Sequence, residues 1–149
     1  MTVLALALRQ SPRQVQREDI DVLAGALSED VNLAVWQRTL PAHVAAFAEQ
    51  LLAQGEPLAQ SMTLEFPGPE HEPELSGLVA QYADLPGQAA FLADVRWLVR
   101  AYACLLDAKR IGLRLRALDK AMCPRFHVDH VPLRLITSYA GIGSQWLEE

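Results

Sequence analysis

The sequence lacks any apolar run that approaches the roughly 20 residues a membrane-spanning helix needs, so it predicts a protein that does not cross a membrane. The opening MTVLALALRQ is apolar, but it has neither a basic start nor a small-residue cleavage site, and we do not expect a secretory signal. Cysteine is also scarce, because Cys104 and Cys123 are too few for a disulfide framework. We therefore expect both thiols to be free and the protein to be cytoplasmic.

Two motifs that carry common enzyme chemistry are missing as well. The glycines of GIG at 141–143 are followed neither by a helix nor by the further glycines of a phosphate-binding loop. No serine stands in the context of a nucleophile elbow. The sequence also has no internal repeat and no low-complexity segment. These absences argue against a phosphate loop of that type and against a serine hydrolase.

Positive charge is in short supply over the whole chain, where 13 Lys and Arg face 18 Asp and Glu and the formal net charge is -5. This balance argues against a general nucleic-acid-binding protein. The basic residues are nevertheless concentrated between residues 96 and 134, where nine of them accompany three acids. Such a region suits a small anionic molecule, or it is a solvated face that pairs with the acidic remainder. The nine are Arg96, Arg100, Lys109, Arg110, Arg114, Arg116, Lys120, Arg125 and Arg134.

The composition is that of a globular protein. Of 149 residues, 51% are hydrophobic and 21% are charged, which suits a single domain over residues 1–149 with its own core. The part up to about residue 110 is predicted to be mainly helical. Apolar residues recur at helical spacing from 20 to 27, and VNLAVW at 31–36 predicts a short buried strand. Pro41 is expected to begin the next helix, which Gly55 can end.

A longer helix is predicted from about Gly87 to Ala108, after a proline-rich loop at 66–74 that carries an exposed His71. The apolar residues of this helix are spaced by four and three, so they line one stripe. Cys104 is expected to pack in the core, as free cysteine usually does. The stripe consists of Phe91, Val95, Leu98, Tyr102 and Leu105.

The region from about 111 to 149 is predicted to be rich in strands. In IGLRLRALD, apolar residues alternate with arginine, which is typical of a strand half in the core. Further strands are predicted at 131–139 and 144–149. We therefore expect an α+β fold in which a helical N-terminal half packs on a small antiparallel sheet, which 31–36 could join. The sheet could be a partial double-stranded β-helix, and its exposed edge would then invite pairing in a homodimer.

The stretch CPRFHVDH, residues 123–130, concentrates the side chains that could do chemistry. On a strand, Arg125, His127 and Asp129 project from one face, and the stems of the last two lie roughly 6.5–7 Å apart. This pair could hold iron(II) with coordination positions left open, or zinc together with Cys123. The alternative is a structural histidine that hydrogen-bonds to the neighbouring aspartate, with Arg125 balancing the charge of that aspartate.

The residues that follow this stretch resemble a known enzyme pattern. Arg134 and Tyr139 lie on the next predicted strand, and the glycines at 141 and 143 and Trp146 come after it. This order resembles the iron/2-oxoglutarate oxygenases of the prolyl-hydroxylase type. The resemblance implies that His127 and Asp129 bind iron and that Arg125 or Arg134 meets the carboxylate of 2-oxoglutarate.

A closer resemblance covers most of the chain. MCPRFHVDHVPLRLITSYAGIGSQWLEE at 122–149, NLAVWQR at 32–38 and the helix from Phe91 resemble the bacterial family called domain of unknown function 1826. Members of this family are similar in gene context to zinc-homeostasis proteins. The resemblance therefore implies a connection with metals but names no reaction.

The family pattern continues after the tryptophan with a distal histidine and arginine that this sequence lacks. A third metal ligand would then be His43, His71, His130 or Cys123, or it would be missing from a truncated form. Three functions remain open at this point. They are a metal-dependent enzyme similar to the oxygenases, a non-catalytic zinc-binding or metal-homeostasis protein, and a structural domain without a ligand.

Overall fold

The computed structural model describes residues 13–123 and 125–148, and the apolar opening for which no secretory signal is expected lies outside them. Contacts divide the chain into two compact units. One consists of the described residues up to Thr39 together with 147 and 148, and the other consists of residues 40–146. Each unit is described by itself.

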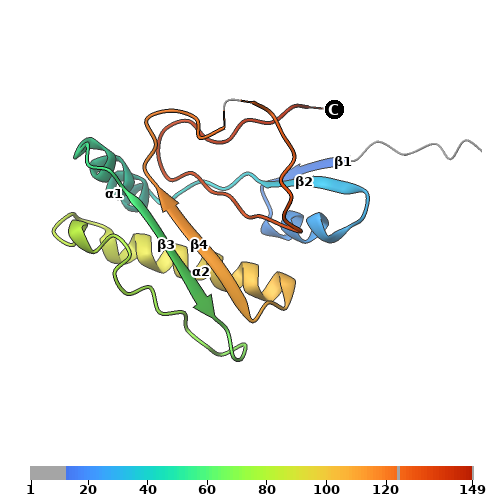
Figure 1. The fold of residues 1–149 in the computed structure, drawn as a ribbon, viewed down its shortest axis with the longest axis horizontal. Helices are drawn as coiled ribbons and strands as arrows, with labels where there is room; N and C mark the ends of the chain where they lie inside the picture. Colours follow the sequence, from blue (N-terminus) through green and yellow to red (C-terminus); the bar gives the residue numbers. More distant parts are fainter. Residues whose placement is uncertain (1–12, 124, 149) are drawn as a thin grey trace, which may run out of the picture. The chain divides into compact units, whose positions relative to one another are not determined.

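The first unit is built on two parallel strands, β1 (Arg13–Arg17) and β2 (Val31–Trp36) (Figure 1). The 3-10 helix η1 (Ile20–Leu27) connects them, and the side chain of Asp19 caps it by accepting a hydrogen bond from the backbone N–H of Asp21 at 2.8 Å. The strand predicted at 31–36 is present, but only Val31 of it is buried, so the expectation of a buried strand is only partly met. The predicted helix at 20–27 is present as a 3-10 helix, whereas β1 was not expected.

The second unit contains an antiparallel pair of strands, β3 (Ala59–Glu65) and β4 (Arg110–Arg116). Their register places Leu64 opposite Ile111, and both side chains are buried. Alternation therefore turns one face of the pair to the core and the other to solvent, as the pattern of IGLRLRALD predicts. Figure 1 shows this pair lying across the helix α2 (Gln88–Leu106).

The core of the second unit lies between this sheet, α2 and the helix α1 (Ala42–Ala53). Phe47 of α1 is fully buried, and its ring centre lies 5.0 Å from that of Phe91 on α2. Gly87, which precedes α2, makes this approach possible. Its φ is +91°, and a Cβ there would lie 2.8 Å from the carbonyl oxygen of His43. Both helices were expected, α1 from Pro41 at its start and Gly55 after its end, and α2 from its apolar spacing.

The fold class is α+β, but several expectations about the strands are wrong. Three of the four strands precede residue 110, so the division into a helical first part and a strand-rich last part does not hold. Among the described residues after Arg116 there is no helix or strand. The described residues form two two-stranded sheets, and β2 pairs with β1 instead of joining the sheet of the second unit. No β-helix is formed in the described part of the chain.

The physical reason is that alternation alone does not make a strand, because its backbone groups need a partner. Proline removes a donor at 124 and 132, and Gly141 turns with a φ of +75°. The three strands expected at 123–130, 131–139 and 144–149 are therefore irregular where they are described. Cys104 also differs from expectation, because it is exposed on α2 and does not pack in the core.

Candidate functional site

The predicted site residues lie on an irregular segment, residues 117–146, drawn in orange to red in Figure 1. Two tyrosines fasten this segment to α2. The hydroxyl of Tyr102 donates to the carbonyl oxygen of Leu133 at 2.7 Å, and the hydroxyl of Tyr139 donates to Oδ2 of Asp94 at 2.6 Å. The ring of Tyr139 also lies edge-on to Phe91, with 4.6 Å between the ring centres. Side-chain tethers thus take the place of a β-ladder here.

Asp129 is the centre of a cluster of three side chains on this segment. Its Oδ1 lies 3.3 Å from Nε2 of His127, and its Oδ2 lies 3.3 Å from Nη1 of Arg134. The side chain of Asp129 is 35% exposed, that of His127 is 52% exposed and that of Arg134 is 46% exposed. Ion pairs this exposed contribute only about 0–1 kcal/mol each to stability. The cluster therefore adds little to the stability of the fold.

The contact of Nδ1 of His127 determines whether Nε2 carries a proton or a lone pair. Nδ1 lies 3.0 Å from the carbonyl oxygen of Arg125, which can only accept a hydrogen bond. Nδ1 therefore carries a proton, and in the neutral imidazole Nε2 is the nitrogen with the free lone pair, 3.3 Å from Oδ1 of Asp129. Both atoms of this pair are then acceptors, so a positive charge between them would make the approach more favourable.

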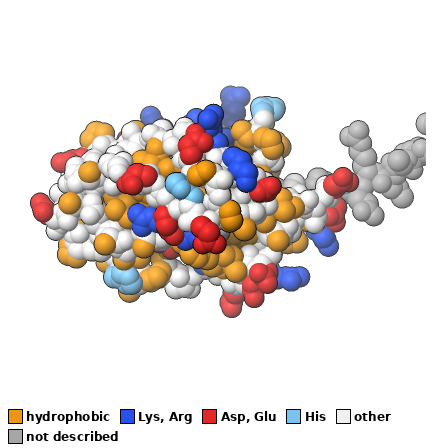
Figure 2. Space-filling model, turned by 90° about the horizontal axis from the view of Figure 1, so that it is seen from below, with side chains coloured by type: hydrophobic (Ala, Val, Ile, Leu, Met, Phe, Trp, Pro, Cys, Tyr) orange, Lys and Arg blue, Asp and Glu red, His pale blue; other side chains and the backbone are white. Residues whose placement is uncertain are grey.

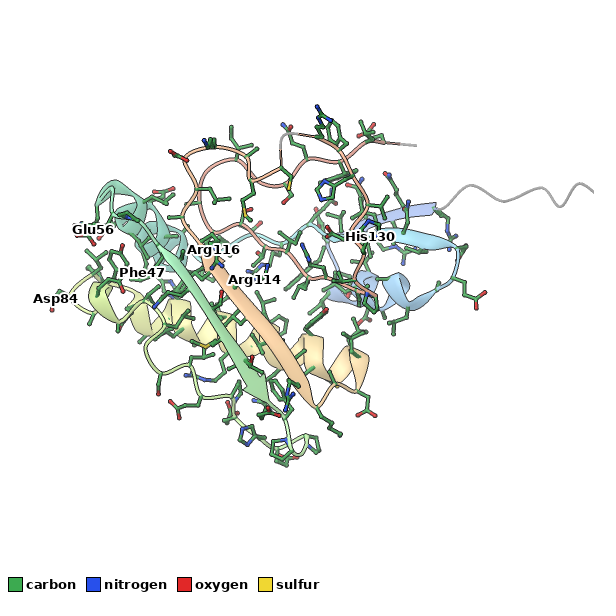
Figure 3. All side chains as sticks on the ribbon, viewed as in Figure 1. Phe47, Glu56, Asp84, Arg114, Arg116 and His130 are labelled. Atoms are coloured by element: carbon green, nitrogen blue, oxygen red, sulfur yellow. The ribbon has the colours of Figure 1, made fainter. Side chains whose placement is uncertain are left out.

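The other predicted ligands do not join this pair. Cys123, His43, His71 and His130 are all exposed, and His130 is labelled in Figure 3 on the same irregular segment. No group of three or more His, Cys, Asp or Glu that could hold a metal ion occurs in the part of the chain that the structure describes. The site is thus a two-residue one as far as the described side chains define it.

The two arginines predicted to meet a co-substrate have different positions. Arg134 forms the ion pair with Asp129. Arg125 was expected from the sequence to take this position. Arg125 is exposed, and its described contact is the one that its backbone carbonyl makes with His127. The prediction considered only residues on one face of a single strand at 123–130. Arg134 lies beyond Pro132, so it was not considered as a partner of Asp129.

Most of the basic region is paired locally. Six of its nine cations contact carboxylates, carbonyls or a hydroxyl, and Figure 2 shows acidic and basic side chains interspersed on the face that it presents. Arg116, labelled in Figure 3 on β4, donates to the carbonyl oxygen of Gln60 at 2.7 Å and to the hydroxyl of Ser61 at 3.0 Å. These contacts favour the interpretation of a solvated, charge-paired face.

The first unit carries an open hollow of about 370 Å³ lined by Trp36, Arg38 and their neighbours. The guanidinium of Arg38 lies 5.4 Å from the ring centre of Trp36, within reach of a cation–π contact. None of the site residues predicted from the sequence lines it. The hollow is wide and shallow, so we place the candidate site at Asp129 on the grounds of its chemistry.

Comparison with known proteins gives one match. A family model described as a protein of unknown function (DUF1826) matches residues 17–149. No curated protein and no solved structure matches the chain, so the resemblance to oxygenases receives no support from these comparisons. Within the described residues, no helix has the length and apolar character needed to span a membrane. Because the match covers far more than half of the sequence, the chain belongs to the DUF1826 family.

Proposed function

We propose that the protein binds a divalent metal ion between Nε2 of His127 and Oδ1 of Asp129. The observation that supports this function is the 3.3 Å separation of these two atoms, combined with the contact of Nδ1 to a backbone carbonyl. Metal-binding histidines commonly donate their other ring N–H to a carbonyl or carboxylate, which fixes the tautomer. Two donors at 2.0–2.2 Å from one ion lie about 3.0–3.4 Å apart in octahedral or tetrahedral coordination.

Two protein ligands leave several coordination positions for water or for a small anion. Imidazole and carboxylate suit zinc and iron(II) alike, so the donor set allows both metals. An enzyme of the oxygenase type would hold iron here, and the metal would supply the activation of oxygen. Because Arg134 already holds Asp129, Arg125 is then the arginine left to meet the carboxylate of 2-oxoglutarate. A zinc-binding protein without catalysis would instead need a third ligand such as Cys123.

Metal titration of chelator-treated protein tests the proposal. We expect one zinc or iron(II) ion per chain by calorimetry and metal analysis, and a loss of affinity of about tenfold or more in His127→Ala and in Asp129→Asn. His130→Ala is the matched control, because His130 is an exposed histidine of the same segment that does not belong to the pair. Equal metal binding by the wild type, His127→Ala and Asp129→Asn would refute the site.

The choice between enzyme and zinc protein needs a separate measurement. Oxygen-dependent turnover of 2-oxoglutarate by the iron-loaded protein, abolished in His127→Ala, would establish the enzyme. Zinc binding that weakens in Cys123→Ser, without any turnover of 2-oxoglutarate, would establish the non-catalytic function. Bound iron with no turnover of 2-oxoglutarate counts against the oxygenase.

A further inference from the structure

We propose that Tyr102 of α2 is a positioning residue for the His127–Asp129 pair. Its hydroxyl holds the backbone at Leu133, so that the next residue, Arg134, keeps the carboxylate of Asp129 turned toward His127. The role of the pair in binding metal rests on the function proposed above. The positioning itself is a statement about the chain alone and is tested separately below.

The contacts form one continuous path from α2 to the imidazole. Tyr102 donates to the carbonyl oxygen of Leu133 at 2.7 Å. Arg134 follows directly and contacts Oδ2 of Asp129 at 3.3 Å, which leaves Oδ1 facing Nε2 of His127 at the same distance. No helix or strand holds the backbone of the described residues on this segment. The orientation of the carboxylate therefore depends on such side-chain contacts.

The electrostatics of Tyr102 support the same path. Burial raises the pKa of Tyr102, and the positive charge of Arg134 lowers it in part. The positive charge of Arg134 therefore acts on the hydroxyl of Tyr102, which donates to the carbonyl of the preceding residue, Leu133. The hydroxyl also keeps its proton at neutral pH and remains a donor to the carbonyl of Leu133.

Tyr139 provides a matched comparison on the same segment. It also fastens the segment to α2 with its hydroxyl, but through Asp94, and its ring packs on Phe91. It lies five residues beyond Arg134 in the sequence, and its hydroxyl holds a side chain of α2 and not the backbone next to Arg134. Replacing either tyrosine by phenylalanine removes one hydroxyl and keeps the ring. Only the change at Tyr102 should alter metal binding by His127 and Asp129.

Cobalt(II) is a suitable probe because its visible spectrum reports the ligand geometry. We expect Tyr102→Phe to weaken cobalt binding by about tenfold and to change the spectrum, as loss of a contact outside the ligands does at other metal sites. Tyr139→Phe should bind within about twofold of the wild type. In a double-mutant cycle, Asp129→Asn should cost less affinity in the Tyr102→Phe background than in the wild type. Independent, additive effects of the two changes would overturn the positioning role.

A measurement without metal separates this inference from the proposed function. Rotation of the Arg134 guanidinium, followed by ¹⁵N NMR in metal-free protein, should be slow in the wild type and in Tyr139→Phe and faster in Tyr102→Phe. If the wild type binds no cobalt, the proposed function fails, while this comparison still decides the role of Tyr102. Equal rotation rates in the wild type and Tyr102→Phe would show that Tyr102 positions nothing.

Discussion

Tyr102 has a half-buried hydroxyl whose titration can be followed at high pH. Burial raises the pKa of Tyr102 above its usual value of 10.0, and Arg134 opposes this rise in part. A raised pKa in the folded state means that the unfolded chain releases the proton first as the pH increases. The contribution of Tyr102 to stability is therefore complete below pH 10 and is lost as the pH rises through the pKa of the folded state.

We expect the difference in free energy of unfolding between the wild type and Tyr102→Phe to be constant from pH 7 to about 10 and to shrink above it. Below that pH the variant should be less stable by about 1 kcal/mol, since it lacks the hydrogen bond to Leu133. Urea unfolding at a series of pH values measures both quantities. Parallel stability curves up to the most alkaline pH at which the protein folds would contradict the prediction.

The limits of prediction at the residue scale are visible in Asp129. The spacing of His127 and Asp129 placed the two side chains near each other, and they do meet at 3.3 Å. The partner of Oδ2 could not be predicted in the same way. Arg134 reaches it from beyond the bend at residues 130–132, and the path of such an irregular segment depends on tethers like that of Tyr102, which a local pattern does not contain.

At the scale of helices and strands, the spacing of apolar residues predicted the elements that bury one face. The apolar residues of α2 and the alternation of β4 predict both elements. The strand β3 also alternates, with Leu64 buried, but this signal is short and lies beside a proline-rich loop. The strand β1 has a single apolar residue among RQVQR, and its existence depends on pairing with β2. Pairing between distant segments is the information that a local pattern lacks.

The contact between α1 and α2 gives a prediction at this scale. Gly87 combines a φ of +91° with a position where a Cβ would lie 2.8 Å from the carbonyl oxygen of His43 and 3.1 Å from Cβ of Phe47. We expect Gly87→Ala to lower the free energy of unfolding by about 2–4 kcal/mol, because the new Cβ adds backbone strain and forces α1 away from α2.

The matched control is Gly112→Ala on β4, where φ is not positive and nothing lies within 4 Å of an added Cβ. This change should be neutral within about 0.5 kcal/mol or slightly stabilising, since it reduces the freedom of the unfolded chain. Denaturant unfolding of both variants gives the comparison. A loss at Gly87 no larger than that at Gly112 would mean that the two helices do not approach each other as described.

At the scale of the whole molecule, exposed apolar side chains are unevenly distributed along the sequence. Eight of the twelve large exposed hydrophobic residues among the described ones lie between 118 and 146. The same segment carries His127, Asp129 and Arg134, so the candidate metal pair is surrounded in sequence by apolar side chains that solvent reaches. These eight are Leu118, Met122, Phe126, Val128, Val131, Ile136, Ile142 and Trp146.

This distribution predicts that the folded protein binds a hydrophobic dye mainly through the irregular segment, residues 117–146. Val128 is 84% exposed and Ile142 is 90% exposed, so replacing both by serine should reduce dye fluorescence and change the free energy of unfolding by less than about 0.5 kcal/mol per site. Leu52→Ser on the exposed face of α1, where the side chain is 41% exposed, is the comparison and should leave the fluorescence nearly unchanged. Fluorescence that stays constant in Val128→Ser/Ile142→Ser while that variant remains folded would show that these side chains are covered in solution, because dye binding follows the apolar surface that water can reach.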